Sequence, residues 1–272
     1  MSGQLLLEVK NLCRRFGGII ANNNVCFEVR EDSITSLIGP NGAGKTTVFN
    51  CVTGFYAATS GEIFLHGPNG SVEVGNLLNR PFTGGSYLVS RAGIARTFQN
   101  IRLFKDMTVL ENLLVAQHRS QNRNLLSGIF VTHDFSNKEE ESVNRAYEWL
   151  DMVDLAVDAN RLAGELSYGR QRRLEIARAM CTNPRLICLD EPAAGLNPRE
   201  TVDLSNLIRK LRDECKVTVL LIEHDMGLVM DISDHIVVMD QGSVIDSGSP
   251  EHIRNSDVVI AAYLGTDVED EA

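Results

Sequence analysis

The run of residues from 39 to 46 has the types and spacing that phosphate chemistry needs. It consists of Gly39, Pro40, Asn41, Gly42, Ala43, Gly44, Lys45 and Thr46. This fits glycine, four variable residues, glycine, lysine and then serine or threonine. Glycines let such a loop curl until its backbone N–H groups point at phosphate oxygens. Lys45 would then neutralise the β- and γ-phosphates of a nucleotide, and the Thr46 hydroxyl would ligate Mg²⁺.

Two acids follow an apolar stretch that we expect to form a strand. Asp190 and Glu191 come directly after residues 186–189. Carboxyl ends of parallel strands line the ligand crevice of α/β folds, so both acids should reach a nucleotide bound at residues 39–46. Asp190 would hold Mg²⁺ through water, and Glu191 would polarise the water that attacks the γ-phosphate. Without the phosphate-binding run, two acids after a strand would more simply indicate a helix start.

Three polar residues are weaker candidates when each is taken alone. His224 follows the apolar stretch 217–222, and Gln99 ends the short stretch 94–99. A lone histidine there is more often a hydrogen-bonded core or surface residue, and a lone glutamine an ordinary loop residue. At the same sheet edge, His224 would contact the γ-phosphate and Gln99 would face Mg²⁺ or water. Ser167 fits the N-cap of a following helix, a place that can bind an anion although most such places bind nothing.

A parallel sheet is needed to bring these residues together, and the sequence predicts one. Apolar stretches of strand length alternate with helical patterns, as buried parallel strands do, at 33–38, 186–189, 217–222 and 235–239. Residues 5–9 and 25–29, with Gly17 and Gly18 between them, predict two antiparallel strands. Residues 46–52 predict a helix directly after the phosphate-binding run. The pattern is typical of an α/β layer protein.

The segment from about residue 108 to 163 differs because its periodicity is helical. Ser136 and Glu139 have the spacing of a capping box, which predicts a helix start. The apolar stripe of that helix, interpreted as core packing, consists of Val143, Ala146, Tyr147 and Leu150. Residues 122–136 predict a loop, and residues 68–85 an exposed excursion. We expect an α/β body interrupted by a helical lobe.

Composition disfavours several classes of protein. The 272 residues carry 36 acidic and 26 basic side chains, a net charge of −10, which disfavours a nucleic-acid partner. The six cysteines contain no Cys-x-x-Cys pair, so we expect reduced core thiols rather than disulfides or a metal site. No apolar run approaches the roughly 20 residues that cross a bilayer, and the beginning of the chain lacks the basic flank of a secretory signal. We therefore expect a soluble intracellular protein.

The order of these motifs resembles that of the nucleotide-binding subunits of ATP-binding cassette transporters. In that family a phosphate loop is followed by a glutamine loop, a Leu-Ser-x-Gly step (here residues 166–169), a strand with Asp-Glu and a strand with His. The match covers about residues 5 to 245. Stretches similar to the ATP-binding subunits of branched-chain amino-acid importers begin at Arg96, Asn112, Gln171 and Glu191. The resemblance implies a P-loop NTPase core of the RecA-like type, with an antiparallel β subdomain and an inserted α-helical subdomain.

The resemblance also implies a role for each matching residue. Phe16 would stack on the adenine of ATP, and the residues from Gly39 to Thr47 would hold its phosphates. Ser167 and Gly169 would contact the γ-phosphate bound by a second subunit. The remaining implied roles are Glu191 as the general base, His224 as a γ-phosphate contact, Gln99 as the sensor of the transmembrane partner, and Thr46, Gln99 and Asp190 around Mg²⁺.

The family pattern further implies boundaries and partners. The ATP-binding core with its antiparallel subdomain would comprise residues 1–98 and 169–248, the helical subdomain 99–168, and short C-terminal helices with an acidic tail 249–272. Implied partners are a sibling or identical cassette, two transmembrane permease subunits and, indirectly, a periplasmic or extracellular binding protein. The implied place is the cytoplasmic side of the inner membrane, as a peripheral ATPase.

Other functions are compatible with these motifs, and three residues depart from the usual family pattern. Urea importers and lipopolysaccharide-export ATPases share most of these motifs. A soluble cassette ATPase acting on nucleic acid or ribosomes is a different class, but such proteins usually carry two cassettes or long coiled-coil arms, and this chain has one cassette and no heptads. Tyr168 stands where the family usually has glycine, Arg170 where glutamine is common, and Asn197 where aspartate is usual.

Overall fold

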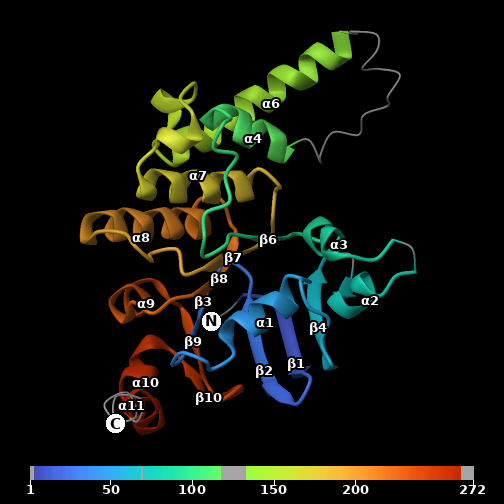
Figure 1. The fold of residues 1–272 in the computed structure, drawn as a ribbon, viewed down its shortest axis with the longest axis vertical. Helices are drawn as coiled ribbons and strands as arrows, with labels where there is room; N and C mark the ends of the chain where they lie inside the picture. Colours follow the sequence, from blue (N-terminus) through green and yellow to red (C-terminus); the bar gives the residue numbers. More distant parts are fainter. Residues whose placement is uncertain (1–2, 69, 82, 118–132, 265–272) are drawn as a thin grey trace.

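The computed structural model describes residues 3–68, 70–81, 83–117 and 133–264, and its strands form two sheets (Figure 1). The first sheet is antiparallel and has the order β2-β1-β4-β5. Its strands are β1 (Leu5–Phe16), β2 (Ile19–Arg30), β4 (Ser60–Gly67) and β5 (Gly70–Glu73). The predicted strands at 5–9 and 25–29 are confirmed. They are longer than expected because the pairing continues to the hairpin turn at Gly17 and Gly18.

The second sheet has the order β10-β9-β3-β8-β7-β6. Its strands are β3 (Ile34–Ile38), β6 (Ile94–Arg96), β7 (Leu186–Asp190), β8 (Thr218–Ile222), β9 (His235–Asp240) and β10 (Ser243–Gly248). All neighbours run parallel except β9 and β10. Every residue of β3, β7 and β8 is buried, because apolar clusters cover both faces of the sheet. The predicted parallel strands and the α/β class are confirmed.

Helices connect the strands of this core. They are α1 (Lys45–Val52), α2 (Val74–Leu78), α3 (Ser86–Arg91), α8 (Pro198–Asp213) and α9 (Met226–Ile232). The predicted helix at 46–52 is α1, which begins directly after residues 39–44. A capping box starts α8: the Asn197 side chain accepts from the Glu200 N–H, and the Glu200 carboxylate accepts from the Asn197 N–H. This cap fixes the end of the loop that follows Glu191.

A helical lobe lies at the top of Figure 1, beyond the second sheet. It consists of α4 (Val109–Gln117), α6 (His133–Met152), the 3₁₀ helices η2 (Ala156–Asp158) and η3 (Ala163–Glu165), and α7 (Tyr168–Met180). One apolar cluster includes Leu113 of α4, Leu150 of α6, Leu174 of α7 and Ile187 of β7, so the lobe packs on the sheet. The helical interruption is confirmed, and its boundaries at residues 99 and 168 stay a prediction.

Two details predicted for α6 are wrong. The helix begins at His133, before Ser136, so the Ser136–Glu139 spacing does not mark its start. Such spacing allows a cap but does not stop helix from forming upstream. In the predicted stripe Ala146 and Leu150 are fully buried, whereas Tyr147 is 37% exposed. The four predicted positions cover a wider part of the helix surface than the part that packs on the core. Of the predicted loop at 122–136, residues 122–132 lie outside the described residues.

Residues 68–85 are more ordered than the predicted excursion. They contain β5 and α2, and Val74 and Leu77 of α2 are buried in the cluster beneath the first sheet. The burial of these two apolar residues, one helical turn apart, therefore favours a helix although the residues around them favour turns. The cysteine expectation is also only partly met. All six thiols are free, but Cys51, Cys181 and Cys188 alone are buried and Cys26 is exposed.

Two short helices follow β10. They are α10 (Pro250–Arg254) and α11 (Asp257–Leu264), and they confirm the predicted C-terminal helices. Figure 1 shows them beside β9 and β10, at the end of the molecule opposite the helical lobe. Among the described helices, none has the length and apolar character to span a bilayer.

Candidate active site

The phosphate loop, residues 39–46, connects the buried strand β3 to α1, so the positive end of the α1 dipole faces it. Two of its glycines are required sterically. Gly39 has a φ of 145°, and a Cβ there would lie 2.0 Å from the Met239 carbonyl oxygen. Gly44 has a φ of 93°, and its Cβ would lie 2.5 Å from the Ala21 carbonyl oxygen. Only glycine fits these two positions.

Lys45 is buried against its own loop. Its ammonium donates to the carbonyl oxygens of Gly39 at 2.6 Å and Pro40 at 2.9 Å. Burial lowers the pKa of this ammonium, and the negative charge of Glu191 acts in the opposite direction. Charged phosphate oxygens are stronger acceptors than amide carbonyls, so a nucleotide can take the ammonium over from the loop.

Glu191 lies between two other predicted site residues. The Gln99 amide donates to its Oε2 at 2.7 Å, and Nε2 of His224 lies 2.7 Å from its Oε1. The Glu191 backbone has a φ of 46°, a strained value for a residue with a side chain that is typical of functional turns. Its side chain is 17% exposed and that of His224 is 44% exposed. Three segments distant in the sequence therefore meet at one carboxylate.

An active-site hollow of about 490 Å³ joins the phosphate loop to this carboxylate. Residues 41–47 line it together with Glu191 and His224. The sequence did not single out its other lining residues, which are Ile19, Ile20 and Ala21 of β2, and Gln241 and Gly242 between β9 and β10. The Gly242 N–H donates to the Ala43 carbonyl oxygen at 3.1 Å and so braces the loop. The only sequence signal for this brace is the turn before β10.

Asp190 is paired with Arg96, a residue for which the sequence predicts no role at this site. The Arg96 guanidinium donates to its Oδ2 at 2.7 Å, and both side chains are more than nine-tenths buried. The donor set for Mg²⁺ nevertheless fits, because the Thr46 hydroxyl, the Gln99 amide oxygen and the second Asp190 oxygen are the hard ligands that this ion prefers. Arg96 pairs with Oδ2 and holds the Asp190 side chain in place.

The predicted site residues that do not line the hollow are Gly39, Pro40, Gln99, Asp190, Phe16, Ser167 and Gly169, and the last three make other contacts. Phe16 is 39% exposed, lies edge-on to Tyr56 at 5.3 Å, and has the Arg14 guanidinium 4.5 Å from its ring centre. Ser167 is the exposed N-cap of α7 and makes no capping bond with its side chain. Gly169 faces Glu200, whose Oε1 would lie 2.5 Å from a Cβ at that position.

Residues 22–194 match the ABC transporter family, and the match spans well over half of the chain. The chain belongs to that family. BraF of Pseudomonas aeruginosa, a high-affinity branched-chain amino acid transport ATP-binding protein, is 57% identical over 260 residues, which are 96% of this chain and 98% of BraF. LivG of Escherichia coli, named with the same function, is 52% identical over 262 residues, with the same two shares.

Solved ABC cassettes have the same fold. The ADP conformation of the cassette MJ1267 superposes with a TM-score of 0.79 at 33% identity, covering 96% of this chain and 99% of that one. A dimeric post-hydrolysis state of the cassette MJ0796, bound to ADP and phosphate, gives 0.72 at 26% identity, covering 90% and 99%. The cassette fold expected from the sequence is thus confirmed over almost the whole chain.

The three departures from the usual cassette pattern each have a partner here. The Tyr168 hydroxyl accepts from Arg172 at 3.2 Å, and its ring lies 3.3 Å from where a Gly195 Cβ would be. The Arg170 guanidinium pairs with Asp158 of η2. Asn197 caps α8, as described above. All three side chains therefore stabilise the chain locally.

Glu223 is a buried acid for which no motif predicted a role. Glu223 accepts from the N–H groups of Ala193 at 2.7 Å and His224 at 3.0 Å, which joins the ends of β7 and β8 beneath the hollow. Burial raises the pKa of its carboxyl group, and these hydrogen bonds act against the rise. Arg172 is fully buried as well. The only hint of a role for Glu223 in the sequence was its position next to His224.

Proposed function

We propose that this chain is the ATP-hydrolysing subunit of an importer for branched-chain amino acids, bound to the cytoplasmic side of the inner membrane. The observation that carries hydrolysis is Glu191, held between Gln99 and His224 at the hollow that Lys45 also lines. For the solute, the support is the alignment with BraF and LivG over almost their full lengths.

In the proposed reaction, Lys45 leaves the carbonyls of Gly39 and Pro40 and binds the β- and γ-phosphates with the loop N–H groups. Glu191 accepts a proton from the attacking water as the water oxygen bonds to the γ-phosphorus. The bond from that phosphorus to the bridging oxygen breaks, and ADP leaves with its electron pair. His224 contacts the γ-phosphate, and Gln99 orients the water. Mg²⁺ held by Thr46, Gln99 and Asp190 would neutralise charge on the phosphate oxygens.

The proposal includes a second cassette, either a sibling or an identical chain. Ser167 and Gly169 lie at the start of α7 and do not line the hollow of their own chain in the described residues. A facing cassette would bring its own copies of these residues to the γ-phosphate. Hydrolysis then removes the group that both cassettes hold, so the pair closes on ATP and opens on ADP.

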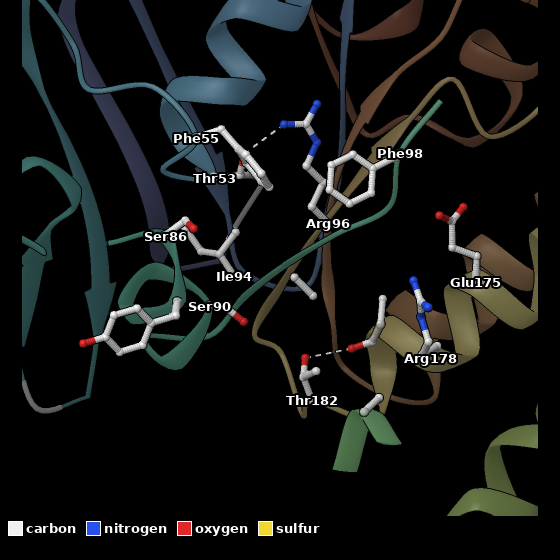
Figure 2. A pocket seen from close by; sticks show the side chains of 14 residues that line it. Thr53, Phe55, Ser86, Ser90, Ile94, Arg96, Phe98, Glu175, Arg178 and Thr182 are labelled. Atoms are coloured by element: carbon white, nitrogen blue, oxygen red, sulfur yellow. Dashed lines mark hydrogen bonds between the residues drawn. The ribbon is translucent and has the colours of Figure 1, made fainter. Parts of the chain in front are cut away.

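For the transmembrane partners we propose a groove between the core and the helical lobe. A cavity of about 320 Å³ lies there, and Figure 2 shows Phe55 and Phe98 on one side and Arg178 of α7 on another. Phe98 precedes Gln99, so a permease segment in the groove would act directly on the residue that contacts Glu191. The exposed aromatic rings and charges of the groove suit a short amphipathic helix.

Uptake by a reconstituted transporter tests this function. The chain is assembled with its two permease subunits and sibling cassette in proteoliposomes that contain ATP and magnesium, with a solute-loaded binding protein outside. ATP-dependent uptake of labelled leucine is expected, and it should disappear when the chain carries Glu191→Gln. Uptake of urea without leucine would contradict the proposed solute, and nucleic acid retained by the purified chain would favour the alternative class.

A further inference from the structure

The segments that contain Glu191 and His224 leave two neighbouring strands at the same level. β7 and β8 are parallel, and Asp190 is opposite Ile222 in their register. The Glu191 N–H still donates to the Ile222 carbonyl oxygen at 2.9 Å, one residue beyond the end of β7. The described sheet pairing between these strands ends there, so the separation of Glu191 from His224 depends on contacts outside the strands.

Glu223 joins the two segments through both oxygens of one carboxylate. Its Oε1 accepts from the Ala193 N–H at 2.7 Å, and its Oε2 accepts from the His224 N–H at 3.0 Å. The Asp225 N–H lies 3.4 Å from the same Oε2. The residue is only 3% exposed, so water competes little for these N–H groups. Because Ala193 follows Glu191 by two residues, one carboxylate connects the loop after β7 to the loop after β8.

The backbone at Glu191 is of the kind that needs such a connection. Its φ of 46° lies in the left-handed region, which a residue with a side chain keeps only where surrounding contacts hold it. Pro192 has no N–H, so the first N–H after Glu191 is that of Ala193, and Glu223 accepts from it. The next N–H, of Ala194, donates back to the Glu191 carbonyl oxygen at 3.2 Å and so stays within the turn. Glu223 therefore anchors this turn from outside.

We propose that Glu223 is a positioning residue for hydrolysis, whose carboxylate keeps the loop that contains Glu191 at a fixed distance from the loop that contains His224. The direct hydrogen bond between Glu191 and His224 must be exchanged when a nucleotide and a water enter. The bonds to Glu223 need not be exchanged, because they involve backbone N–H groups rather than the two side chains. The inference rests on the proposed ATP hydrolysis and adds a residue to which that reaction assigns no part.

Two substitutions separate the bridge from its charge. Glu223→Gln keeps the length of the side chain, but its amide nitrogen cannot accept, so one of the two loops loses its acceptor. Glu223→Asp keeps the charge but is one methylene shorter and cannot span both loops. In both variants kcat for ATP should fall about tenfold to hundredfold, because a displacement of about 1 Å at a reacting group has an effect of this size. The KM and the affinity for magnesium and trinitrophenyl-ATP should stay within about twofold, since Lys45 is untouched.

The matched control is Glu111→Gln, because Oε2 of Glu111 also accepts from a backbone N–H, that of Thr108 at 2.7 Å, beside α4 and away from the hollow. It should leave kcat and binding unchanged. An unchanged kcat in either Glu223 variant would overturn the inference. A parallel loss of kcat and of nucleotide binding would overturn it too, because it would show a merely structural role. Failure of the unsubstituted chain to hydrolyse ATP would instead remove the proposed function itself, so the two failures are distinguishable.

Discussion

At the scale of single residues, the site depends on one carboxylate and the groups that surround it. Glu191 stays close to Lys45 without pairing with it, because Gln99 and His224 occupy its two oxygens and Lys45 donates to its own loop. Each of these bonds must be exchanged when a nucleotide and a water enter. The carboxylate is therefore held in position while remaining able to accept a proton.

Glu191→Gln should remove the proton acceptor and leave the shape of the site unchanged. Turnover of ATP is expected to fall by about 10²- to 10⁴-fold, with ATP binding retained, because a carboxamide cannot act as the base. Phosphate release and nucleotide binding measure the two effects. Glu165→Gln, the same change at an exposed position of η3, is the control and should keep full activity. Continued hydrolysis by Glu191→Gln would show that another group is the base.

The sequence predicted which residues would meet at this site but not how they would bond. Strand ends follow from apolar runs, and parallel strands bring their carboxyl ends to one edge, so Gln99, Glu191 and His224 could be placed together. The ion pair of Arg96 with Asp190 could not be predicted, because it depends on side-chain conformations across β6 and β7. The same holds for Lys45, which donates to its own loop.

At the scale of elements, α7 is fastened to the segment that contains Gln99. Arg172 is fully buried and donates to the carbonyl oxygens of Phe98 at 2.6 Å and Gln99 at 2.7 Å, and it pairs with Glu175 at 2.9 Å. Glu175 in turn accepts from the N–H of Arg102. Arg172 therefore links the segment that contains Gln99 to α7, the helix that begins next to Ser167.

Arg172→Met should keep most of the volume and remove these polar contacts. Two carbonyls and the Glu175 carboxylate would lose a buried donor, so the free energy of unfolding should fall by about 3 to 5 kcal/mol. Denaturant unfolding measures it. Arg161→Met, at a half-exposed ion pair, is the control and should cost less than about 1 kcal/mol. Equal losses for the two variants would contradict the role given to Arg172.

Element boundaries show where sequence patterns fail. Ser136 and Glu139 have the spacing of a capping box, yet α6 begins earlier, whereas the capping box that does form uses Asn197, noted in the sequence only as a departure from the family. A cap needs a change of backbone direction, and that change depends on what the preceding residues pack against. Local spacing alone does not contain this information.

At the scale of the whole molecule, the cassette has a nearly complete phosphate site. The helical lobe and the C-terminal helices lie at opposite ends of Figure 1, with strands of the second sheet between them. In the described residues Ser167 is not among those that line the hollow that contains Lys45. This arrangement suits a protein whose nucleotide lies between two copies or siblings.

The most direct measurement is equilibrium binding of ATP to the purified chain with and without magnesium, beside a Lys45→Ala variant. The account predicts magnesium-dependent binding by the unsubstituted chain. The variant should bind at least about tenfold more weakly, because its loop offers N–H groups but no ammonium to the phosphates. Absence of magnesium-dependent ATP binding, or full retention of it in Lys45→Ala, would contradict the account.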